Sequence, residues 1–268
     1  MNQNVIINTQ PQFAIRLAAS EDEVRIAQKL RYDVFHVEQG ATPVCSSGFD
    51  VDVFDQHCDH LLVTRAITTH SNPQLCTNGE EVVGTYRLLR QTIAEQNQGF
   101  YSQNEYDLEP LLRRKADLSF LELGRSCVLP ECRGTAVIEL LWQGIWNYVR
   151  HYRLDVMFGC ASFTGTKPSA HAHALHFLAH NVTAPDQWLV RAKPERYVEM
   201  KTKTLTQIDQ RRALARLPPL IKAYLRVGAF VGEGAVIDHA FNTTDVFILL
   251  PVSNINPRYF SHFGAPTN

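Results

Sequence analysis

The stretch from residue 120 to residue 152 most constrains the fold of this chain, because it predicts a buried strand that runs directly into a helix. In its first half Leu121, Leu123 and Val128 are apolar, and Pro130 follows them. The second half has apolar residues at helical spacing along one face, namely Val137, Leu141, Ile145, Tyr148 and Val149. A strand followed at once by a helix is typical of α/β proteins.

The turn between these halves and the strand itself carry residues that indicate chemistry. Arg133 and Gly134 lie in the turn, and free backbone N–H groups at the start of a helix bind anions. Glu122 and Arg125 lie inside the apolar strand, with Gly124 between them. A buried charge is costly unless it is paired or used. We therefore expect the functional site at this strand.

Length and composition limit the classes of protein to which the chain can belong. Its 268 residues, 45% of them hydrophobic, suffice for one large domain or two small ones. The net charge of −1 argues against a nucleic-acid-binding protein. With no long apolar run and no charged-then-apolar amino terminus, we expect neither a membrane-spanning helix nor a signal peptide. Six scattered cysteines without CxxC pairs are typical of reduced thiols in a cytoplasmic protein.

The rest of the chain predicts an α/β fold with mixed strand directions. Ser20 and Glu23 form a capping-box signature that opens the first helix. Residues 59–67 and 81–89 predict a hairpin. The other expected elements are a short helix at 108–114, a strand at 155–163, a helix at 169–180, strands at 188–192 and 196–200, two basic helices within 201–226 divided at Pro218, a Gly-rich turn after Gly228 and a closing strand at 246–252.

We expect three regions along the chain. Residues 1–12 are polar and predict a disordered tail, and residues 13–200 predict the core. Residues 201–268 predict a C-terminal extension that packs on this core, so that core and extension form one continuous domain.

Further charged side chains fall at apolar positions or gather in one loop. Arg31 shares an edge with the apolar stripe of the first helix, and Arg87 lies in the most apolar part of the second hairpin strand. Each arginine fits either a packed stem whose head reaches water or an anion clamp. The aspartates at positions 50, 52, 55 and 59 fit either a solvated loop or the binding of a cationic substrate group.

Histidines at positions 171, 173, 176 and 180 raise the question of a metal site. Three of them fall near one face of the expected helix, but no carboxylate accompanies them in the HExxH manner. We therefore expect polar residues on a helix surface and no bound metal.

Several long motifs carry a resemblance to a known family. They are LRYDVF, FDVDVFDQHCDHLLV, VGTYRLL, LELGRSCV, MFGCASF, LPPLIKAYLRVGAFVGEGAVID and FNTTDVFILLPV. Together they resemble the bacterial L-ornithine Nα-acyltransferases of the GNAT superfamily, over residues 13–263. The first half also resembles the acyl-homoserine-lactone synthases, whose motif pattern matches Arg31, Phe35, Asp55, Asp59, Arg87, Glu122 and Arg125.

The resemblance implies a GNAT-like fold, with a mixed, mostly antiparallel central sheet flanked by helices and a C-terminal extension. It also implies that a 3-hydroxyacyl group passes from acyl carrier protein to the α-amino group of L-ornithine, giving lyso-ornithine lipid without a cofactor. The loop that cradles CoA pyrophosphate in acetyl-CoA-using relatives is reduced here to Arg133 and Gly134. Carrier-bound phosphopantetheine has one phosphate, so this cradle fits acyl-phosphopantetheine better than CoA.

The resemblance also assigns roles to the site residues. Glu122 and Arg125 are the expected catalytic residues, with Glu122 as the base for the α-ammonium group. A bulge at Gly124 would bring both side chains to one face of the strand. The expected substrate-binding residues are Arg31, Phe35, Asp55, Asp59 and Arg87. The expected donor-binding residues are Gly124, Ser126, Val128, Arg133 and Gly134. The basic segment 201–226 is expected to dock the acidic carrier protein.

Other interpretations stay open at this point. One is an acyl-homoserine-lactone synthase-like enzyme, although those enzymes lack the long C-terminal region; another is an acceptor such as glutamine, lysine or glycine. An acyl-cysteine mechanism through Cys127 or Cys160 lacks a visibly paired histidine. A membrane-lysing role lacks a cationic amphipathic helix. Because the implied product is a lipid, we expect a cytoplasmic protein with transient contact at the surface of the inner membrane.

Overall fold

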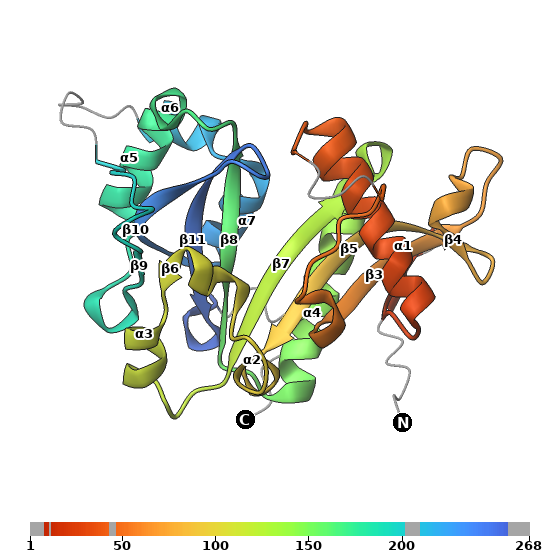
Figure 1. Cartoon of the computed structure of the whole chain (residues 1–268), viewed down its shortest axis with the longest axis horizontal. Coiled ribbons are helices and arrows are strands. Elements are labelled where there is room, and N and C mark those ends of the chain that lie inside the picture. Colours follow the sequence, from red (N-terminus) through yellow and green to blue (C-terminus); the bar gives the residue numbers. More distant parts are fainter. Residues whose placement is uncertain (1–7, 11, 43–46, 202–209, 257–268) are drawn as a thin grey trace. The chain divides into compact units, whose positions relative to one another are not determined.

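The chain forms two compact units, each made from two separate segments (Figure 1). Residues 1–98 and 123–153 build the first unit, and residues 99–122 and 154–266 build the second. The residues described by the computed structural model are 8–10, 12–42, 47–201 and 210–256.

The first unit is built on an antiparallel sheet. Its strands are β1 (Asn8–Gln10), β2 (Phe13–Leu17), β3 (Asp59–Ala66), β4 (Cys76–Thr77) and β5 (Glu80–Arg90). They follow the order β1-β2-β3-β5, and β4 also pairs with β5. The expected hairpin is confirmed as β3 and β5. Strand β1 falls within the segment for which a tail is expected.

The first helix of this unit begins where the sequence predicts. In α1 (Glu21–Tyr32) the Ser20 hydroxyl accepts a hydrogen bond from the Glu23 backbone N–H at 3.3 Å. The Glu23 carboxylate in turn accepts from the backbone N–H of Ala19 at 2.7 Å, which satisfies another free donor at the helix start. A π-helical segment, Asp33–Glu38, continues α1.

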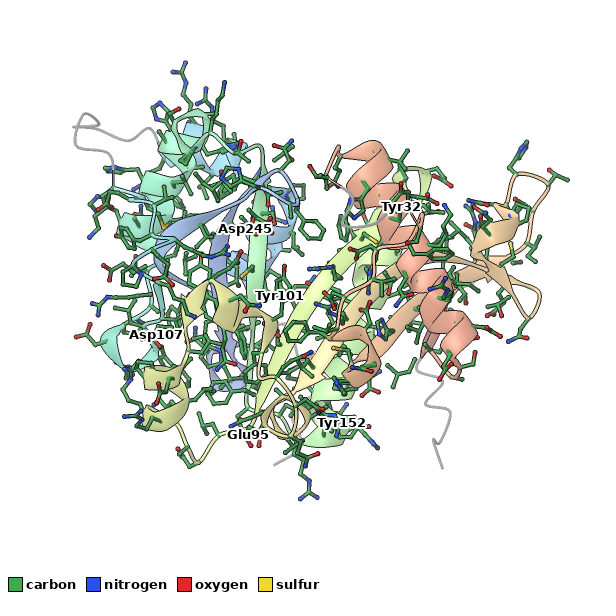
Figure 2. All side chains as sticks on the ribbon, viewed as in Figure 1. Tyr32, Glu95, Tyr101, Asp107, Tyr152 and Asp245 are labelled. Atoms are coloured by element: carbon green, nitrogen blue, oxygen red, sulfur yellow. The ribbon has the colours of Figure 1, made fainter. Side chains whose placement is uncertain are left out.

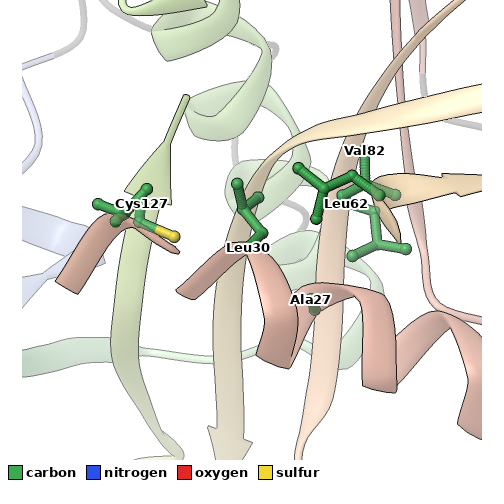
Figure 3. Close-up of a cluster of buried hydrophobic side chains, with 7 residues drawn as sticks. Ala27, Leu30, Leu62, Val82 and Cys127 are labelled. Atoms are coloured by element: carbon green, nitrogen blue, oxygen red, sulfur yellow. The ribbon is translucent and has the colours of Figure 1, made fainter. Parts of the chain in front are cut away.

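Helices α1 and α4 (Thr135–Tyr152) cover opposite faces of this sheet. Leu30 of α1 packs with Leu62 of β3 in a buried cluster (Figure 3). The neighbouring Leu61 points to the other face. There, a Cβ added at Gly144 of α4 would lie only 2.8 Å from a Leu61 methyl carbon, so the helix approaches the sheet closely. The whole cluster on the α1 face consists of Ala27, Leu30, Val34, Leu62, Leu75, Val82 and Cys127.

Strand β7 (Phe120–Val128) carries the chain from the second unit into the first. Its first three residues pair in parallel with Val156–Phe158, and its later residues follow β5 in the strand order. The extended backbone is interrupted at Arg125, where φ is +52°, and not at Gly124. This conformation costs a non-glycine residue about 1–2 kcal/mol.

The second unit has a sheet with the strand order β8-β11-β10-β9-β6. Its strands are β6 (Tyr106–Asp107), β8 (Val156–Thr164), β9 (Arg191–Ala192), β10 (Phe230–Asp238) and β11 (Thr243–Pro251). All neighbours are antiparallel except β9 and β10, which are parallel. Because β10 and β11 pair with earlier strands, this part of the expected C-terminal extension belongs to the same sheet as β8. The predicted division near residue 200 itself stays a prediction.

Two expectations for this sheet are wrong. Of the strands expected at 188–192 and 196–200, only Arg191–Ala192 is a strand, and the second segment contributes one isolated bridge. The Gly-rich segment after Gly228 is not a turn but the strand β10. Its glycines made a turn look favourable, yet in the structure they let other parts of the chain approach closely. A Cβ added at Gly232 would lie 2.8 Å from the carbonyl oxygen of Val190.

The helices of the described chain are mostly short. Besides α1 and α4 they are α2 (Gln91–Glu95), α3 (Glu109–Arg114), α5 (Ala172–Asn181), α6 (Gln210–Arg216) and α7 (Pro219–Val227). Single helical turns lie at Asp55–His57, Pro73–Leu75, Tyr101–Asn104, Pro130–Cys132, Pro168–His171, Asp186–Trp188 and Val252–Asn254. The expected division of the basic segment at Pro218 is confirmed, although residues 202–209 lie outside the described part. Within the described ranges, the helices are too short or too polar to cross a bilayer.

We expect the substitution Gly228→Ala to destabilise the second unit by about 2–3 kcal/mol. Gly228 ends α7 with φ +109°, and a Cβ there would lie 2.6 Å from the carbonyl oxygen of Asn254. Gly165→Ala is the matched control, since Gly165 has φ +101° with nothing within 4 Å of an added Cβ. It should cost only about 1 kcal/mol. Urea denaturation of both variants checks this, and equal losses would contradict the role of the close contact.

Candidate functional site

Arg31 is a buried cation that is fully engaged by two aspartates. Its Nε donates to Asp50 Oδ2 at 2.7 Å, and its Nη1 and Nη2 donate to Asp55 Oδ1 and Oδ2, both at 2.8 Å. Nη2 also donates to the backbone carbonyl of Asp50. The side chain is 1% exposed, so its head does not reach water as one interpretation of the sequence had it. Two parallel N–H···O bonds to one carboxylate are the strong geometry for this pair.

Arg87 and Arg125 extend this pairing to strands β5 and β7. Nη1 of Arg87 donates to Asp52 Oδ1 at 2.6 Å and to Asp55 Oδ1 at 3.0 Å. Arg125 donates from Nε to Asp50 Oδ2 at 3.2 Å and from Nη2 to Asp52 Oδ2 at 2.9 Å. Three guanidinium groups thus meet three carboxylates. We call these six residues the arginine–aspartate network.

Side chains from α1 and from the neighbouring segments complete the hydrogen bonding of this network. Gln28 of α1 donates from Nε2 to Asp55 Oδ2 at 3.0 Å. His60 Nε2 lies 3.1 Å from the backbone carbonyl oxygen of Asp55, and His36 Nε2 lies 3.5 Å from Asp50 Oδ1. The aspartates therefore sit in a structured and largely buried polar cluster, and the solvated-loop interpretation is wrong for Asp50 and Asp55.

The charges of the network keep its carboxylates ionised. Burial by itself raises the pKa of Asp55, but the hydrogen bonds and charge of Arg31, helped by Arg87, outweigh it and hold the pKa well below its usual value. For Asp50 burial is again the largest single effect, and the charges of Arg125 and Arg31 overcome it, so that the pKa is lowered. Both aspartates carry a negative charge at neutral pH.

Two residues expected to bind substrate lie apart from these ion pairs. Asp59, at the start of β3, accepts a hydrogen bond from the Tyr148 hydroxyl and lies 3.7 Å from Nη2 of Arg90. Phe35 packs, partly buried, against the hydrophobic cluster beneath α1. Roles for both in substrate binding stay predictions.

The residues expected to bind the acyl donor lie at the end of β7 and in the turn before α4. Ser126 and Val128 are on the strand, and Gly134 is the N-cap residue of α4. Arg133 donates from Nε to the Val128 carbonyl oxygen at 3.1 Å. It also forms a bidentate ion pair with Glu38, in which Nη1 donates to Oε1 at 2.6 Å and Nη2 to Oε2 at 2.5 Å. Roles for these residues in binding the donor stay predictions.

Glu122 belongs to the second unit and is held by the turn Tyr101–Asn104. Its Oε2 accepts from the backbone N–H of Tyr101 at 2.7 Å. Its Oε1 accepts from the backbone N–H of Ser102 at 2.7 Å and from the Ser102 hydroxyl at 2.5 Å. The residue is only 5% exposed. These donors fix the orientation of the carboxylate and stabilise its negative charge.

A second cluster of polar side chains extends from Ser102 to Cys160 of strand β8 and to Glu105. Cys160 Sγ lies 3.6 Å from Ser102 Oγ and 3.4 Å from Oε2 of Glu105. The other oxygen of Glu105, Oε1, lies 3.6 Å from Nη1 of Arg196. Tyr101, which precedes Ser102 in the chain, and Asp245, which lies close to Glu105, are labelled in Figure 2.

Glu105 lies in an acidic surrounding. Carboxylate oxygens of Glu105, Asp238 and Asp245 all lie within 4.8 Å of one another. Burial, and then the negative charges of Asp245 and Asp238, raise the pKa of Glu105 to about 7. Acidic groups commonly gather without an ion, and we assign no metal to these three residues.

The four histidines lie at the N-terminal end of α5 and along it. The rings of His176 and His180 have centroids 4.3 Å apart. His180 is exposed as expected, but His176 is buried, so a surface position is wrong for that residue. Burial, then the nearby His180 and His173, lower its pKa.

Sequence reasoning missed the partners of Glu122. Ser102 and Glu105 lie in a polar loop without a recognisable motif, and Cys160 drew attention only as a nucleophile. The one signal was indirect, because a buried glutamate on an apolar strand requires donors from somewhere in the chain.

Comparison with known proteins places the chain among acyltransferases. Residues 30–143 match the family described as acetyltransferase (GNAT) domain. A protein from Brucella abortus (strain 2308), named L-ornithine N(alpha)-acyltransferase, is 49% identical over 257 residues, which cover 95% of this chain and 89% of that protein. The chain belongs to the L-ornithine Nα-acyltransferase family.

Another L-ornithine Nα-acyltransferase, from Rhodobacter capsulatus, is 40% identical over 92% of this chain and 93% of its own length. Among solved structures, FeeM, an N-acyl amino acid synthase from uncultured soil microbes, shares the fold. It has a TM-score of 0.54 and 10% identity, covering 94% of this chain and 100% of that one. The GNAT-like fold expected for an L-ornithine Nα-acyltransferase is thereby confirmed.

We expect Asp55→Asn to destabilise the first unit by about 3–5 kcal/mol, because it leaves the buried charges of Arg31 and Arg87 without their shared carboxylate. Asp33→Asn is the matched control. It breaks a more exposed pair with Lys29 of α1 and should cost no more than about 0.5 kcal/mol. Chemical denaturation measures both variants, and a similar small loss in each would contradict a structural role of the network.

We expect Glu105→Gln to reduce the loss of stability that wild type shows as the pH rises from 4.5 to about 7. A pKa raised from 4.5 to about 7 means that the folded state binds the proton more tightly. This contribution is complete below pH 4.5 and is lost as the pH rises through 7, by up to about 3 kcal/mol. Thermal melting between about pH 5 and pH 8 tests it, with Glu109→Gln, exposed in the same unit, as control. Parallel curves for wild type and Glu105→Gln would refute it.

Proposed function

We propose that this chain transfers a 3-hydroxyacyl group from acyl carrier protein to the α-amino nitrogen of L-ornithine, giving lyso-ornithine lipid. The observation that carries the proposal is the 49% identity with a protein named L-ornithine N(alpha)-acyltransferase across nearly the whole length of both chains. The enzyme uses no resident cofactor, since the phosphopantetheine thioester arrives with the donor.

The reaction needs a base, an oxyanion site and a leaving group. Glu122 takes a proton from the α-ammonium group, and the free amine attacks the thioester carbonyl carbon. Backbone N–H groups near Gly124–Ser126, beyond the paired start of β7, stabilise the oxyanion of the tetrahedral intermediate. The C–S bond then breaks, and the pantetheine sulfur leaves with the second proton that the nitrogen loses as the amide forms. The products are the amide and free carrier protein.

The arginine–aspartate network supplies charges of both signs for ornithine, which has one carboxylate and two ammonium groups. Exposure increases from Arg31 (1%) through Arg87 (4%) to Arg125 (11%), and Asp52 is the most exposed of the aspartates, at 21%. Arg31 and Asp55 therefore act as the buried support. Arg125 and Asp52 are the members that meet the substrate's carboxylate and ammonium groups.

The donor is recognised at two places. Arg133 and Gly134 hold the single phosphate of phosphopantetheine. The carrier protein, which is acidic, docks on the basic helices α6 and α7, where Arg211, Arg212, Arg216 and Arg226 are exposed. During this step the enzyme lies transiently at the inner membrane, where its lipid product leaves.

Direct attack is favoured over an acyl-cysteine intermediate. Burial raises the pKa of the Cys127 thiol far above its usual value. The pKa of Cys160 is also raised, by burial and then by Glu105 and Asp245. A thiol must ionise to act as a nucleophile, so neither cysteine is activated for acyl transfer.

The test is incubation of purified protein with 3-hydroxyacyl carrier protein and a panel of acceptors, followed by mass spectrometry. We expect an Nα-acyl amino acid with a free carboxylate from ornithine, and little product from lysine, glutamine or glycine. A lactone formed from S-adenosylmethionine would indicate the homoserine-lactone reaction instead. Acyl-CoA as an equally good donor would contradict the carrier-protein assignment.

Glu122→Gln should lower kcat by about 10²–10⁴-fold, because the amide cannot accept the proton of the ammonium group. Initial rates under saturating substrate measure this. Glu95→Gln, an exposed carboxylate on α2, should remain at the wild-type rate. Wild-type turnover by Glu122→Gln would remove Glu122 from the role of base.

A further inference from the structure

Four polar side chains of the second unit form one continuous hydrogen-bonded path. It starts at Glu122 Oε1, which accepts from the Ser102 hydroxyl at 2.5 Å. Ser102 Oγ is 3.6 Å from Cys160 Sγ, and that sulfur is 3.4 Å from Glu105 Oε2. Each step lies within hydrogen-bonding distance for its atoms, the two longer ones because sulfur is involved.

The path is largely closed to water. Ser102, Glu105 and Glu122 are all buried, and Cys160 is partly buried on β8. A proton that Glu122 receives therefore cannot simply pass to bulk solvent from its own carboxylate, which is surrounded by the Tyr101 and Ser102 donors. Every turnover nevertheless leaves one proton there, because the ammonium nitrogen loses two protons on becoming an amide and the leaving sulfur takes only one of them.

We propose that Ser102, Cys160 and Glu105 form a proton relay that returns Glu122 to its carboxylate form after it has deprotonated the acceptor amine. The inference rests on the proposed function, in which Glu122 is the base. It adds the route of the proton and the roles of three residues, of which the sequence had pointed only to Cys160, and there as a nucleophile.

The transfer balances as a chain of exchanges. Protonated Glu122 gives its proton to Ser102 Oγ, while the Ser102 hydroxyl proton moves to Cys160 Sγ. The thiol proton of Cys160 moves to Glu105 Oε2. At the end Ser102 and Cys160 are again a hydroxyl and a thiol, Glu122 is a carboxylate, and Glu105 is a carboxylic acid. Glu105 then loses the proton on its Oε1 side, where the half-exposed Arg196 lies.

Glu105 has the acid–base properties that the end of such a relay needs. Asp245 of β11 and Asp238 of β10 face it, and with burial they raise its pKa to about 7. Cys160 of β8 and Arg196 oppose this shift without cancelling it, and Tyr106 is its neighbour along the chain. A group with a pKa near 7 both accepts and releases a proton readily at neutral pH. The Cys160 thiol stays protonated between transfers, because its pKa is raised.

The experiment compares two substitutions of the same residue. Cys160→Ala breaks the path and should lower kcat by about tenfold or more, with the KM values for ornithine and donor unchanged. Cys160→Ser restores a group that both donates and accepts a proton, and should recover at least a few-fold of this loss. Cys76→Ala removes a thiol outside the path and should match wild type. Thermal melting confirms that each variant is folded.

A pH profile separates a relay from a structural contact. In wild type, kcat should rise through an inflection near pH 7 as Glu105 becomes able to accept a proton. The inflection should be absent in Glu105→Gln and in Cys160→Ala. Should Cys160→Ala fail to fold, Glu105→Gln tests the same path from its other end, through this profile and through kcat.

The outcomes distinguish this inference from the proposed function. An inactive Glu122→Gln together with a wild-type rate and profile in Cys160→Ala overturns the relay alone. Equal losses in Cys160→Ala and Cys160→Ser also overturn it, because packing and not proton transfer would then explain the effect. A fully active Glu122→Gln overturns the base and the relay together. Slow Cys160→Ala, partial rescue by serine and loss of the inflection support the relay.

Discussion

The pairing of Arg31 with Asp50 and Asp55 is the interaction on which the first unit depends. Arg31 comes from α1, and both aspartates come from the irregular segment between α1 and β3. Within its described residues, the backbone N–H of Asp50 donates to the carbonyl oxygen of Gln28 in α1, and the ion pairs add to this anchor. Burying such charges is costly, and the cost is met only because every charge finds an opposite one at hydrogen-bonding distance.

Two kinds of buried carboxylate serve the two units. Asp55 is neutralised by cations, so its place depends on charge balance. Glu122 accepts hydrogen bonds from backbone N–H groups and a hydroxyl, which orient it and themselves carry no net charge. The first arrangement makes a fixed scaffold, and the second fixes the orientation of the carboxylate and stabilises its charge.

The sequence predicted the parts of the fold that depend on local rules. The Ser20 cap, the β3–β5 hairpin and strand β8 follow from capping chemistry and from the spacing of apolar residues. The prediction for the Gly-rich segment after Gly228 was wrong. Local propensity favours a turn there, but the close approach of other chain segments to its glycines favours a strand.

The sequence predicted which residues are unusual, but it did not predict which of them pair with one another. Charges at apolar positions correctly marked Arg31, Arg87 and Glu122 as unusual. Their partners could not be predicted from the sequence, because Arg31 and Asp55 are 24 positions apart in the chain and Glu122 and Ser102 are 20 positions apart. Such pairings depend on how the fold brings strands and loops together, and the spacing of apolar residues along the sequence does not predict that.

Charge cancellation within the network has a consequence for the proposed capture of ornithine. Three positive and three negative groups in close proximity have no net monopole, so the field outside them decays much faster than that of one unpaired ion. A substrate with one carboxylate and two ammonium groups therefore feels little long-range attraction from this cluster, and the proposed recognition acts on contact, through the match between the charge pattern of the substrate and that of the exposed edge. Added salt, which screens distant charges most strongly, should leave such short-range selection largely intact.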